Sequence, residues 1–241
     1  LKVGILDADI YGPSVPMLLG KRDVKPKAND AKKIVAEEAH GIKFMGFGLF
    51  IKEEDPVIWR GPMLGGVLNQ FLFDVDWGEL DILIIDLPPG TGDIQLTFSQ
   101  KIPVTGAVIV TTPQDIALLD AKKAVRMFEK VNIPILGIVE NMSYFKPEEL
   151  PDNKYYIFGK DGARNLAEDI ETAFLGEVPL VQSIREAGDV GHPVALQDNT
   201  PLEKAFSEIT KNALSQLVKR NKDLPPTEVV RITTMSGCST K

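Results

Sequence analysis

The chain has 241 residues, of which 44% are hydrophobic and 25% are charged, an ordinary balance for a soluble globular protein. This length allows one substantial α/β domain with a short appendage. The net charge of −7 argues against non-specific binding to nucleic acid, and no apolar run approaches the roughly 18–20 residues of a membrane-spanning helix. The single cysteine, Cys238, excludes an internal disulfide and fits a reducing, cytoplasmic compartment.

The first seven residues, Leu1 to Asp7, read as a strand that begins at once, without an initiator methionine or a signal-peptide pattern. A mature chain rarely opens inside a strand. We therefore expect further residues to precede Leu1 in the natural polypeptide.

Short apolar runs rich in β-branched residues alternate along the chain with stretches that carry apolar residues at helical spacing. The expected strands are Val3–Leu6, Phe44–Phe47, Ile82–Ile85, Ala107–Val110, Ile135–Val139 and Phe174–Leu175. The expected helices are Pro62–Phe73, Ile94–Lys101, Ile116–Val131, Gly162–Ile170 and Pro201–Arg220. This alternation predicts an α/β fold over residues 1–220, a mostly parallel sheet with helices on both faces, and a linker and C-terminal tail over 221–241.

Ligands of such sheets bind beyond the carboxyl ends of the strands, so functional residues are sought there. The first expected strand ends in Asp7 and Asp9, two carboxylates at alternate positions ahead of a tight turn. Two interpretations stay open for this pair. It is either a catalytic pair or an aspartate that caps the following helix.

The expected strand Ile82–Ile85 ends in Asp86, the Walker B pattern in which a carboxylate holds magnesium directly or through water. Gly90 and Gly92 follow, and glycines let backbone N–H groups approach a γ-phosphate closely. A plain strand with a Pro-Gly turn would leave the same local pattern. Three aspartates at strand ends of one sheet are stronger evidence, and we expect Asp7, Asp9 and Asp86 to lie together at one edge.

Another expected strand is followed by Asn141. Its side-chain amide carries a donor and an acceptor side by side, which suits the edge of adenine. The same residue type is also common in turns, so the assignment of Asn141 to a base site stays open at this point.

Five segments, in this order, resemble the Mrp/ApbC family of iron–sulfur carrier ATPases, which is related to MinD, ParA and the nitrogenase iron protein. They are VGILDADIYGPSVPMLLG, VIWRGPMLGGVLNQFL, DILIIDLPPGTGD, VTTPQDIALLDAKKA and GIVENMSYF, and the resemblance runs from about Lys2 to Leu217. It implies a P-loop NTPase of the MinD/ParA type that uses ATP and Mg²⁺ and forms a homodimer around the nucleotide. It also implies delivery of Fe–S clusters to client apoproteins, in concert with scaffold proteins.

The resemblance also implies roles for single residues. Asp9, with Asp7 beside it, would position or activate the attacking water, and Asp86 would hold magnesium. The remaining implied site residues contact the nucleotide: Gly90, Thr91 and Gly92 as γ-phosphate sensors, and Asn141, Pro179 and Leu180 around the adenine, the last two in an expected turn at Val178-Pro179-Leu180.

The chain departs from the family in two respects. No G-x-x-x-x-G-K-[S/T] loop occurs, whereas the family carries GKGGVGKS just upstream of the first strand, so this stretch alone should hardly bind or hydrolyse ATP. The family's C-x-x-C after ENMSYF is replaced by KPEELPDNKYYIFG, which removes the usual bridging [4Fe–4S] site. Cys238 is then the one thiolate candidate for a cluster ligand, although a lone tail cysteine is more often incidental.

Two functions therefore stay open. An ATP-dependent Fe–S carrier is favoured by the DADIYGPS and WRGPM segments, and a MinD/ParA-like nucleotide switch without a metal cluster is favoured by the missing C-x-x-C. In the related folds the P-loop strand lies between the strand ending at Asp86 and the one ending near Thr112. We expect these two strands to leave an open slot and not to pair with each other.

Overall fold

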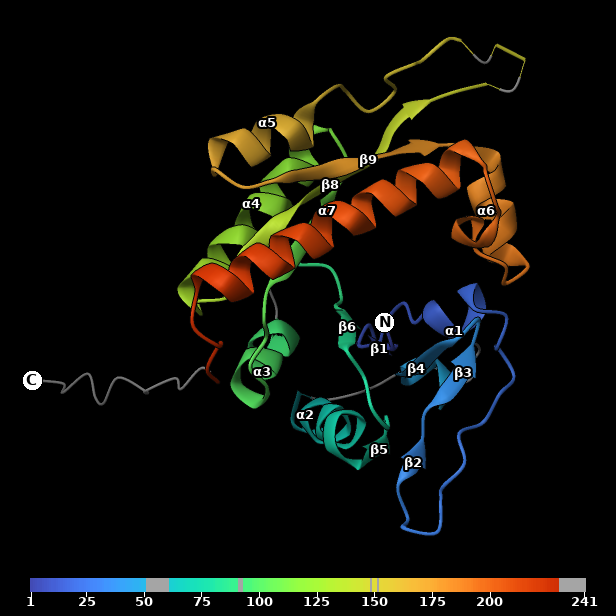
Figure 1. Ribbon diagram of the computed structural model, residues 1–241, viewed down its shortest axis with the longest axis vertical. Coiled ribbons are helices and arrows are strands. Elements are labelled where there is room, and N and C mark those ends of the chain that lie inside the picture. The colour runs from blue at the N-terminus through green and yellow to red at the C-terminus, as the bar shows by residue number, and fades with distance from the viewer. Residues whose placement is uncertain (51–60, 91–92, 148, 151, 230–241) are drawn as a thin grey trace, which may run out of the picture.

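The computed structural model describes residues 1–50, 61–90, 93–147, 149–150 and 152–229, without the side chains of 61–64 and 93 (Figure 1). The expected α/β fold is confirmed. Its strands form three groups, in the orders β3-β4-β1-β6, β2-β5 and β7-β8-β9. No helix within these ranges is both long and apolar enough to cross a membrane.

The N-terminal sheet is built around β1 (Val3–Asp7), which pairs in parallel with β4 (Ile42–Gly46) on one side and with β6 (Ile82–Asp86) on the other. At the edge, β3 (Glu37–Ala39) pairs antiparallel with β4. The turn between them is His40-Gly41, and both residues have positive φ, as the tight turns of hairpins require. A small parallel pair, β2 (Ile34–Val35) with β5 (Val75–Asp76), lies outside this sheet.

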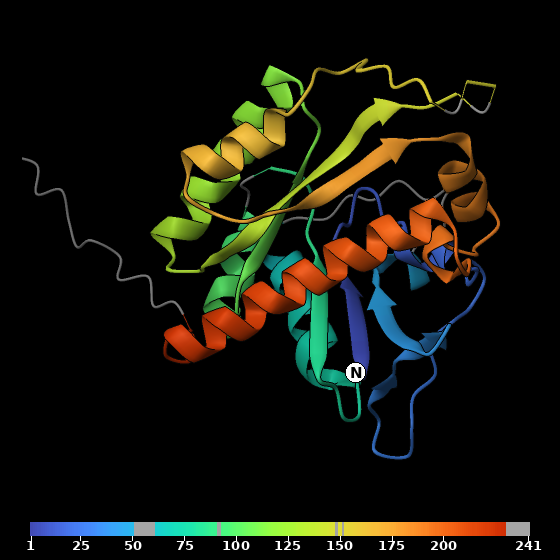
Figure 2. The same cartoon turned by 45° about the horizontal axis from the view of Figure 1, so that its top comes forward.

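The C-terminal sheet consists of three parallel strands, β7 (Ala107–Thr111), β8 (Ile135–Phe145) and β9 (Phe174–Leu180). Helices α4 (Asp115–Lys130) and α5 (Gly162–Asp169) cover one face, and the long α7 (Pro201–Asp223) covers the other (Figures 1 and 2). The remaining helical segments are α1 (Val15–Leu18), α2 (Gly61–Asn69), α3 (Asp93–Lys101), α6 (Gln182–Asp189), a π turn (Gln70–Asp74) and two 3-10 turns (Phe47–Leu49, Val194–Leu196).

All six expected strands and all five expected helices occur, with shifted ends. Phe47 starts a 3-10 turn and does not end a strand, and α7 continues past residue 220 to Asp223. The predicted turn at Val178-Pro179-Leu180 is wrong, because these residues are the last three of β9. Proline is tolerated there because β9 is the edge strand of its sheet.

The apolar core is divided in the same way as the sheets. One cluster of buried side chains packs around the N-terminal sheet, with Phe44, Phe71 and Phe98 among its largest members. Two further clusters lie on the two faces of the C-terminal sheet, and successive β8 residues, Ile138 and Val139, belong to opposite ones. Leu87 packs against the N-terminal cluster and also against the one beneath α4 and α5.

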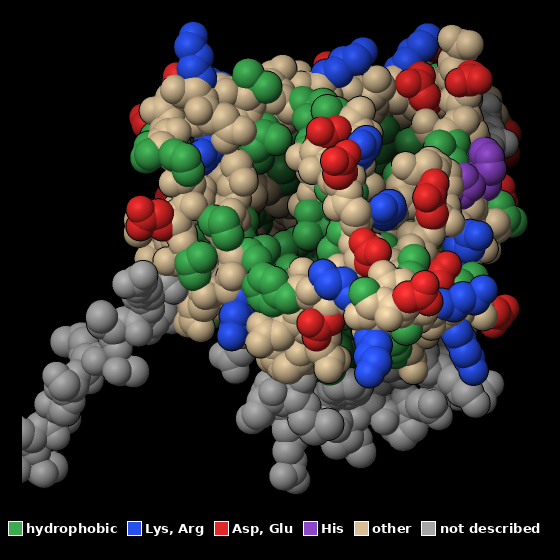
Figure 3. Space-filling view, turned by 60° about the horizontal axis from the view of Figure 1, so that its bottom comes forward, with side chains coloured by type: hydrophobic (Ala, Val, Ile, Leu, Met, Phe, Trp, Pro, Cys, Tyr) green, Lys and Arg blue, Asp and Glu red, His purple; other side chains and the backbone are tan. Residues whose placement is uncertain are grey.

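The expected open slot is confirmed, because β6 and β7 do not pair. Side chains on these two strands are unusually accessible for strands of an α/β sheet, with Ile84 51% exposed and Val110 61% exposed. Figure 3 shows a hollow at the middle of one face, surrounded by hydrophobic side chains. Among the residues that the structure describes, each of the two strands therefore has one edge without a partner strand.

The two halves also meet where α1 approaches α6. Gly20 and Gly191 both have positive φ, and a Cβ added to Gly191 would clash with the backbone of Gly20. The ring of His40 lies near the same place, with its Nε2 3.2 Å from the Gly191 carbonyl oxygen. Close approach of two backbones explains glycine at both positions.

We predict that Gly191→Ala destabilises the protein much more than Gly41→Ala. Both substitutions force alanine into positive φ, at +70° and +75°, which costs about 1–2 kcal/mol. Only Gly191→Ala adds a backbone clash, for about 1–3 kcal/mol more, since a Cβ on Gly41 would meet nothing within 4 Å. Urea denaturation of both variants measures the difference, and equal losses would show that the α1–α6 contact yields without cost.

Candidate functional site

The register of two neighbouring strands creates the acidic cluster. In the β1–β6 pair Asp7 lies opposite Asp86, and the Ala8 N–H donates to the Asp86 carbonyl oxygen at 2.9 Å. Asp9 follows two residues later, close enough for its charge to act on Asp86. The expected clustering of Asp7, Asp9 and Asp86 at one edge of the sheet is therefore confirmed.

Asp7 has the contacts of a cap. Its side chain is completely buried, Oδ2 accepts from the Ser14 and Val15 N–H groups at 3.0 Å each, and Oδ1 accepts from the Asp9 N–H at 3.2 Å. Desolvation raises the pKa of Asp7, although these N–H groups lower it in part. The contacts favour the capping interpretation over the catalytic one for this residue.

Asp9 is partly exposed and is held by a local turn. Its Oδ1 accepts from the Tyr11 and Gly12 N–H groups at 3.0 and 3.1 Å, an arrangement in which an aspartate closes a turn on its own backbone. Oδ2 accepts no hydrogen bond from the described residues, and so it is the oxygen that remains for a ligand or a water molecule.

Asp86 is exposed, yet its carboxyl group is partly desolvated by the surrounding strand ends. This desolvation raises the pKa of Asp86, and the negative charge of Asp9 raises it further. Within the described ranges, no three or more His, Cys, Asp or Glu residues are arranged as a metal site. A single free carboxylate still suits Mg²⁺, which commonly uses one or two carboxylates together with phosphate oxygens and water.

The segment after Asp86 is anchored by a residue that the sequence did not single out. Gly90 is exposed with φ +93°, whereas Thr91 and Gly92 lie outside the described residues. Gln95 is 4% exposed, and its Nε2 donates to the Pro88 carbonyl at 2.8 Å and to the Gly90 carbonyl at 3.0 Å. The available signal was a glutamine in the first turn of a helix, where side chains often bind backbone groups.

The predicted base site lies on the other sheet. Asn141 is half-buried, and its Oδ1 accepts from the N–H of Met142, which has positive φ. Asn141 is opposite Val178 in the β8–β9 pair, and the Ser143 hydroxyl donates to the Val178 carbonyl at 3.1 Å where the register is shifted. Pro179 is buried and Leu180 half-buried at the end of β9. Asn141 lies inside β8, which continues to Phe145 and does not end before Asn141 as expected, whereas Pro179 and Leu180 end the neighbouring β9. All three lie on the sheet that does not carry the aspartates.

Glu140 is a second residue that the sequence did not single out. Its side chain is 2% exposed, and its Oε2 accepts from the Ala163 N–H in the first turn of α5 at 2.8 Å. Burial raises the pKa of Glu140, and the charges of Glu177 and Asp161 contribute in the same direction. The contact connects the end of β8 to α5, which is a structural role.

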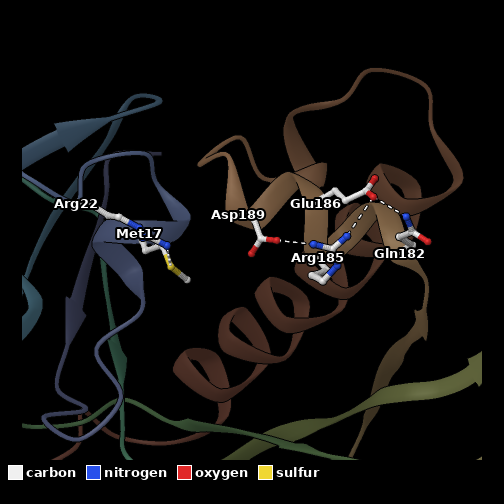
Figure 4. A network of polar contacts seen from close by, with 6 residues as sticks. All are labelled: Met17, Arg22, Gln182, Arg185, Glu186 and Asp189. Atoms are coloured by element: carbon white, nitrogen blue, oxygen red, sulfur yellow. Dashed lines mark hydrogen bonds and ion pairs between the residues drawn. The ribbon is translucent and has the colours of Figure 1, made fainter. Parts of the chain in front are cut away.

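Helix α6, which begins directly after β9, carries a surface network (Figure 4). Arg185 binds Asp189 at 2.6 Å and Glu186 at 3.1 Å, and Gln182 donates to Glu186 at 2.6 Å. Arg22 and Met17 form a separate contact on the α1 side. All four residues of this network lie on α6 itself, and exposed pairs of this kind add little stability. Cys238, the predicted cluster ligand, lies outside the described residues.

Comparison with known proteins shows the family of the chain. Residues 1–214 match the family described as ParA: NUBPL iron-transfer P-loop NTPase. The chain is 47% identical to "Iron-sulfur cluster transfer protein NUBPL" of Dictyostelium discoideum, over 92% of this chain and 69% of the relative. It is 48% identical to "Iron-sulfur cluster carrier protein" of Synechocystis, over 87% of this chain and 60% of the relative. The chain thus spans 60% to 69% of the length of these two relatives.

Among solved structures, the chain is similar to a nucleotide-binding protein of Archaeoglobus fulgidus in complex with ADP. The TM-score is 0.71 at 37% sequence identity, and the match covers 85% of this chain and 79% of that one.

We predict that Asp86→Asn raises the melting temperature of the nucleotide-free and Mg²⁺-free protein by about 1–2 °C at pH 7–8. The pKa of Asp86 is raised in the folded protein, so ionisation of this group disfavours folding. The stability that the wild type loses at neutral pH is regained as pH falls through the folded-state pKa of Asp86. The difference in melting temperature between the variant and the wild type should therefore fade toward pH 4. Thermal unfolding over a pH series measures this.

Asp30→Asn, at an exposed residue outside the cluster, is the control for loss of one carboxylate. A gain from Asp86→Asn that is equal at every pH would contradict the electrostatic explanation.

Proposed function

We propose that this chain, which belongs to the ParA family of iron-transfer P-loop NTPases, is the greater part of an ATPase that carries iron–sulfur clusters to apoproteins. The observation that carries the ATPase part is the strand-end cluster, in which Asp9 and Asp86 lie together with carboxylate oxygens left for ligands. The carrier part is supported by the names of the two relatives, which describe an iron–sulfur cluster transfer protein and an iron–sulfur cluster carrier protein.

In this proposal Asp86 holds Mg²⁺, which would neutralise phosphate charge and orient the γ-phosphate. Asp9 positions the attacking water through Oδ2, because Oδ1 is occupied by its own turn. The role of Asp7 is to hold this turn and the start of α1 through its buried hydrogen bonds, although its carboxyl was expected among the catalytic groups. Asn141, Pro179 and Leu180 form the adenine side of the site.

We further propose that a strand carrying the phosphate-binding loop occupies the slot between β6 and β7. The unpaired edges of these strands, their exposed apolar side chains and the hollow on one face of the molecule support this placement (Figure 3). A P-loop lysine and its backbone N–H groups would complete the site beside Asp9 and Asp86. This sequence alone is then expected to be inactive toward ATP.

The remaining parts of the proposal concern partners and the cluster. We propose a homodimer formed around nucleotide, with scaffold proteins and client apoproteins as partners, in the cytoplasm. The sequence lacks the C-x-x-C of typical members, so Cys238 is the sole cysteine that it offers to a [4Fe–4S] cluster. A cluster bridged between protomers would then receive one thiolate from each, and its other two irons would take ligands that are not cysteines of this sequence.

In the complete protein with its phosphate-binding loop, we predict that Asp9→Asn lowers the rate of ATP hydrolysis about 100-fold or more. Asparagine keeps an oxygen that accepts from Tyr11 and Gly12, so the turn persists while the charge that orients water is lost. Because such a group acts mainly in the transition state, the Kd for ATP should stay within about threefold. Equal losses in ATP affinity and in turnover would contradict the assigned role.

Anaerobic reconstitution of the complete protein with iron and sulfide tests the carrier function. We expect absorbance near 400 nm with stoichiometric iron, and we expect Cys238→Ser to remove it. The same variant should leave ATP hydrolysis unchanged, which separates loss of the cluster from loss of the fold.

A second candidate function is a MinD/ParA-like switch, in which nucleotide controls dimerisation and partner binding without a metal cluster. The observation that favours it is the replacement of C-x-x-C by a segment without cysteine. Absence of iron after reconstitution, together with ATP-dependent dimerisation by light scattering, would favour the switch over the carrier.

A further inference from the structure

Gln95 binds the turn that follows Asp86 in a way that the family assignment does not explain. The residue lies in the first turn of α3 and is buried, whereas Pro89 and Gly90 are exposed. Its side chain reaches back out of the helix and donates from one nitrogen to the carbonyl oxygens of Pro88 and Gly90. The turn is thereby attached to α3 by a side chain.

The chemistry of the contacts fixes the orientation of the amide. Both partners are carbonyl oxygens, which only accept, so Nε2 and not Oε1 must face them. Oε1 is then buried, and the described residues offer it no hydrogen-bond donor. A buried acceptor without a donor costs free energy, so the stabilising contribution of this amide is the pair of hydrogen bonds that Nε2 donates.

The arrangement differs from ordinary capping. A Glu or Gln in the first turn of a helix usually accepts from a backbone N–H at the helix start, and a carboxylate does this as well as an amide. Here Gln95 donates to carbonyl oxygens, which a carboxylate cannot do. Gln95→Glu therefore keeps a residue that favours a helix N-terminus but removes both contacts to the turn.

The turn has a second anchor at its other end. Leu87 packs against the core clusters of both halves of the molecule, and the stiff Pro88-Pro89 pair connects it to Gly90. A peptide unit is planar, so holding the Gly90 carbonyl fixes the orientation of that whole unit. Gly90, with φ +93°, is the flexible residue that Gln95 restrains.

We propose that Gln95 is a positioning residue for nucleotide recognition: by holding Pro88 and Gly90 it keeps the turn after Asp86 in the geometry that recognises the γ-phosphate. The inference rests on the proposed ATPase function. In this role Gln95 lets the protein discriminate ATP from ADP through the turn, without contacting the nucleotide itself.

The test compares Gln95→Glu and Gln95→Met with the control Gln100→Glu, at an exposed residue of the same helix, in the complete protein. Both Gln95 variants should weaken ATP binding about tenfold and leave the Kd for ADP within about twofold, because two hydrogen bonds to the turn are lost. Gln95→Met also removes the unpartnered acceptor, so its melting temperature should not fall while its preference for ATP is lost. Gln100→Glu should behave as the wild type.

A nucleotide-independent measurement keeps this inference separate from the ATPase proposal. In the nucleotide-free protein, the ¹⁵N order parameter of Gly90 should drop from about 0.85 to below about 0.6 in both Gln95 variants. An unchanged order parameter, or an unchanged ratio of ATP to ADP affinity in either variant, would overturn the role of Gln95. If the wild type binds no ATP, the ATPase proposal fails, and the role in nucleotide recognition fails with it; the order parameter then decides only whether Gln95 holds the turn.

Discussion

The parallel pairing of β1 with β6 is the constraint on which the candidate site depends. Backbone hydrogen bonds between these strands bring Asp7 and Asp86 opposite each other, although they are far apart in the sequence. Three carboxylates then gather without a cationic partner among the described residues. Burial raises the pKa values of Asp7 and Asp86, and the charge of a neighbouring carboxylate raises each of them further. An arrangement that costs stability in the empty protein is typical of sites whose missing charge is supplied by a ligand.

Much of this molecule was predictable from the sequence, because the relevant signals are local. Apolar runs of strand length located β1, β6, β7 and β8, and carboxylates at or just after the ends of such runs located Asp7, Asp9 and Asp86. The short elements α1, β2 and β3 were missed because two to four residues carry no measurable periodicity. The turn expected at Val178-Pro179-Leu180 came from the family resemblance. These residues instead end β9, where proline is tolerated because β9 is an edge strand, and edges are set by the tertiary fold.

The roles of single polar residues were less predictable. Asp7 and Asp9 have the same side chain two positions apart. Asp7 is completely buried and accepts three backbone hydrogen bonds, whereas the described residues donate to only one oxygen of Asp9. Gln95 and Glu140 escaped notice because their partners are backbone groups, which every residue type has. Sequence patterns identify the strand ends at which functional side chains lie. Burial then decides which of these side chains is available for a reaction and which one has a supporting, structural role.

The division of the core into separate clusters has a consequence for how the chain folds. The helices and strands of residues 107–223 contact mainly their sequence neighbours, whereas closing β1 on β6 requires ordering a loop of about 80 residues. Local contacts form fastest and long loops close late. The half that is synthesised last is therefore expected to become structured first, and the edge that carries Asp9 and Asp86 is assembled at the end.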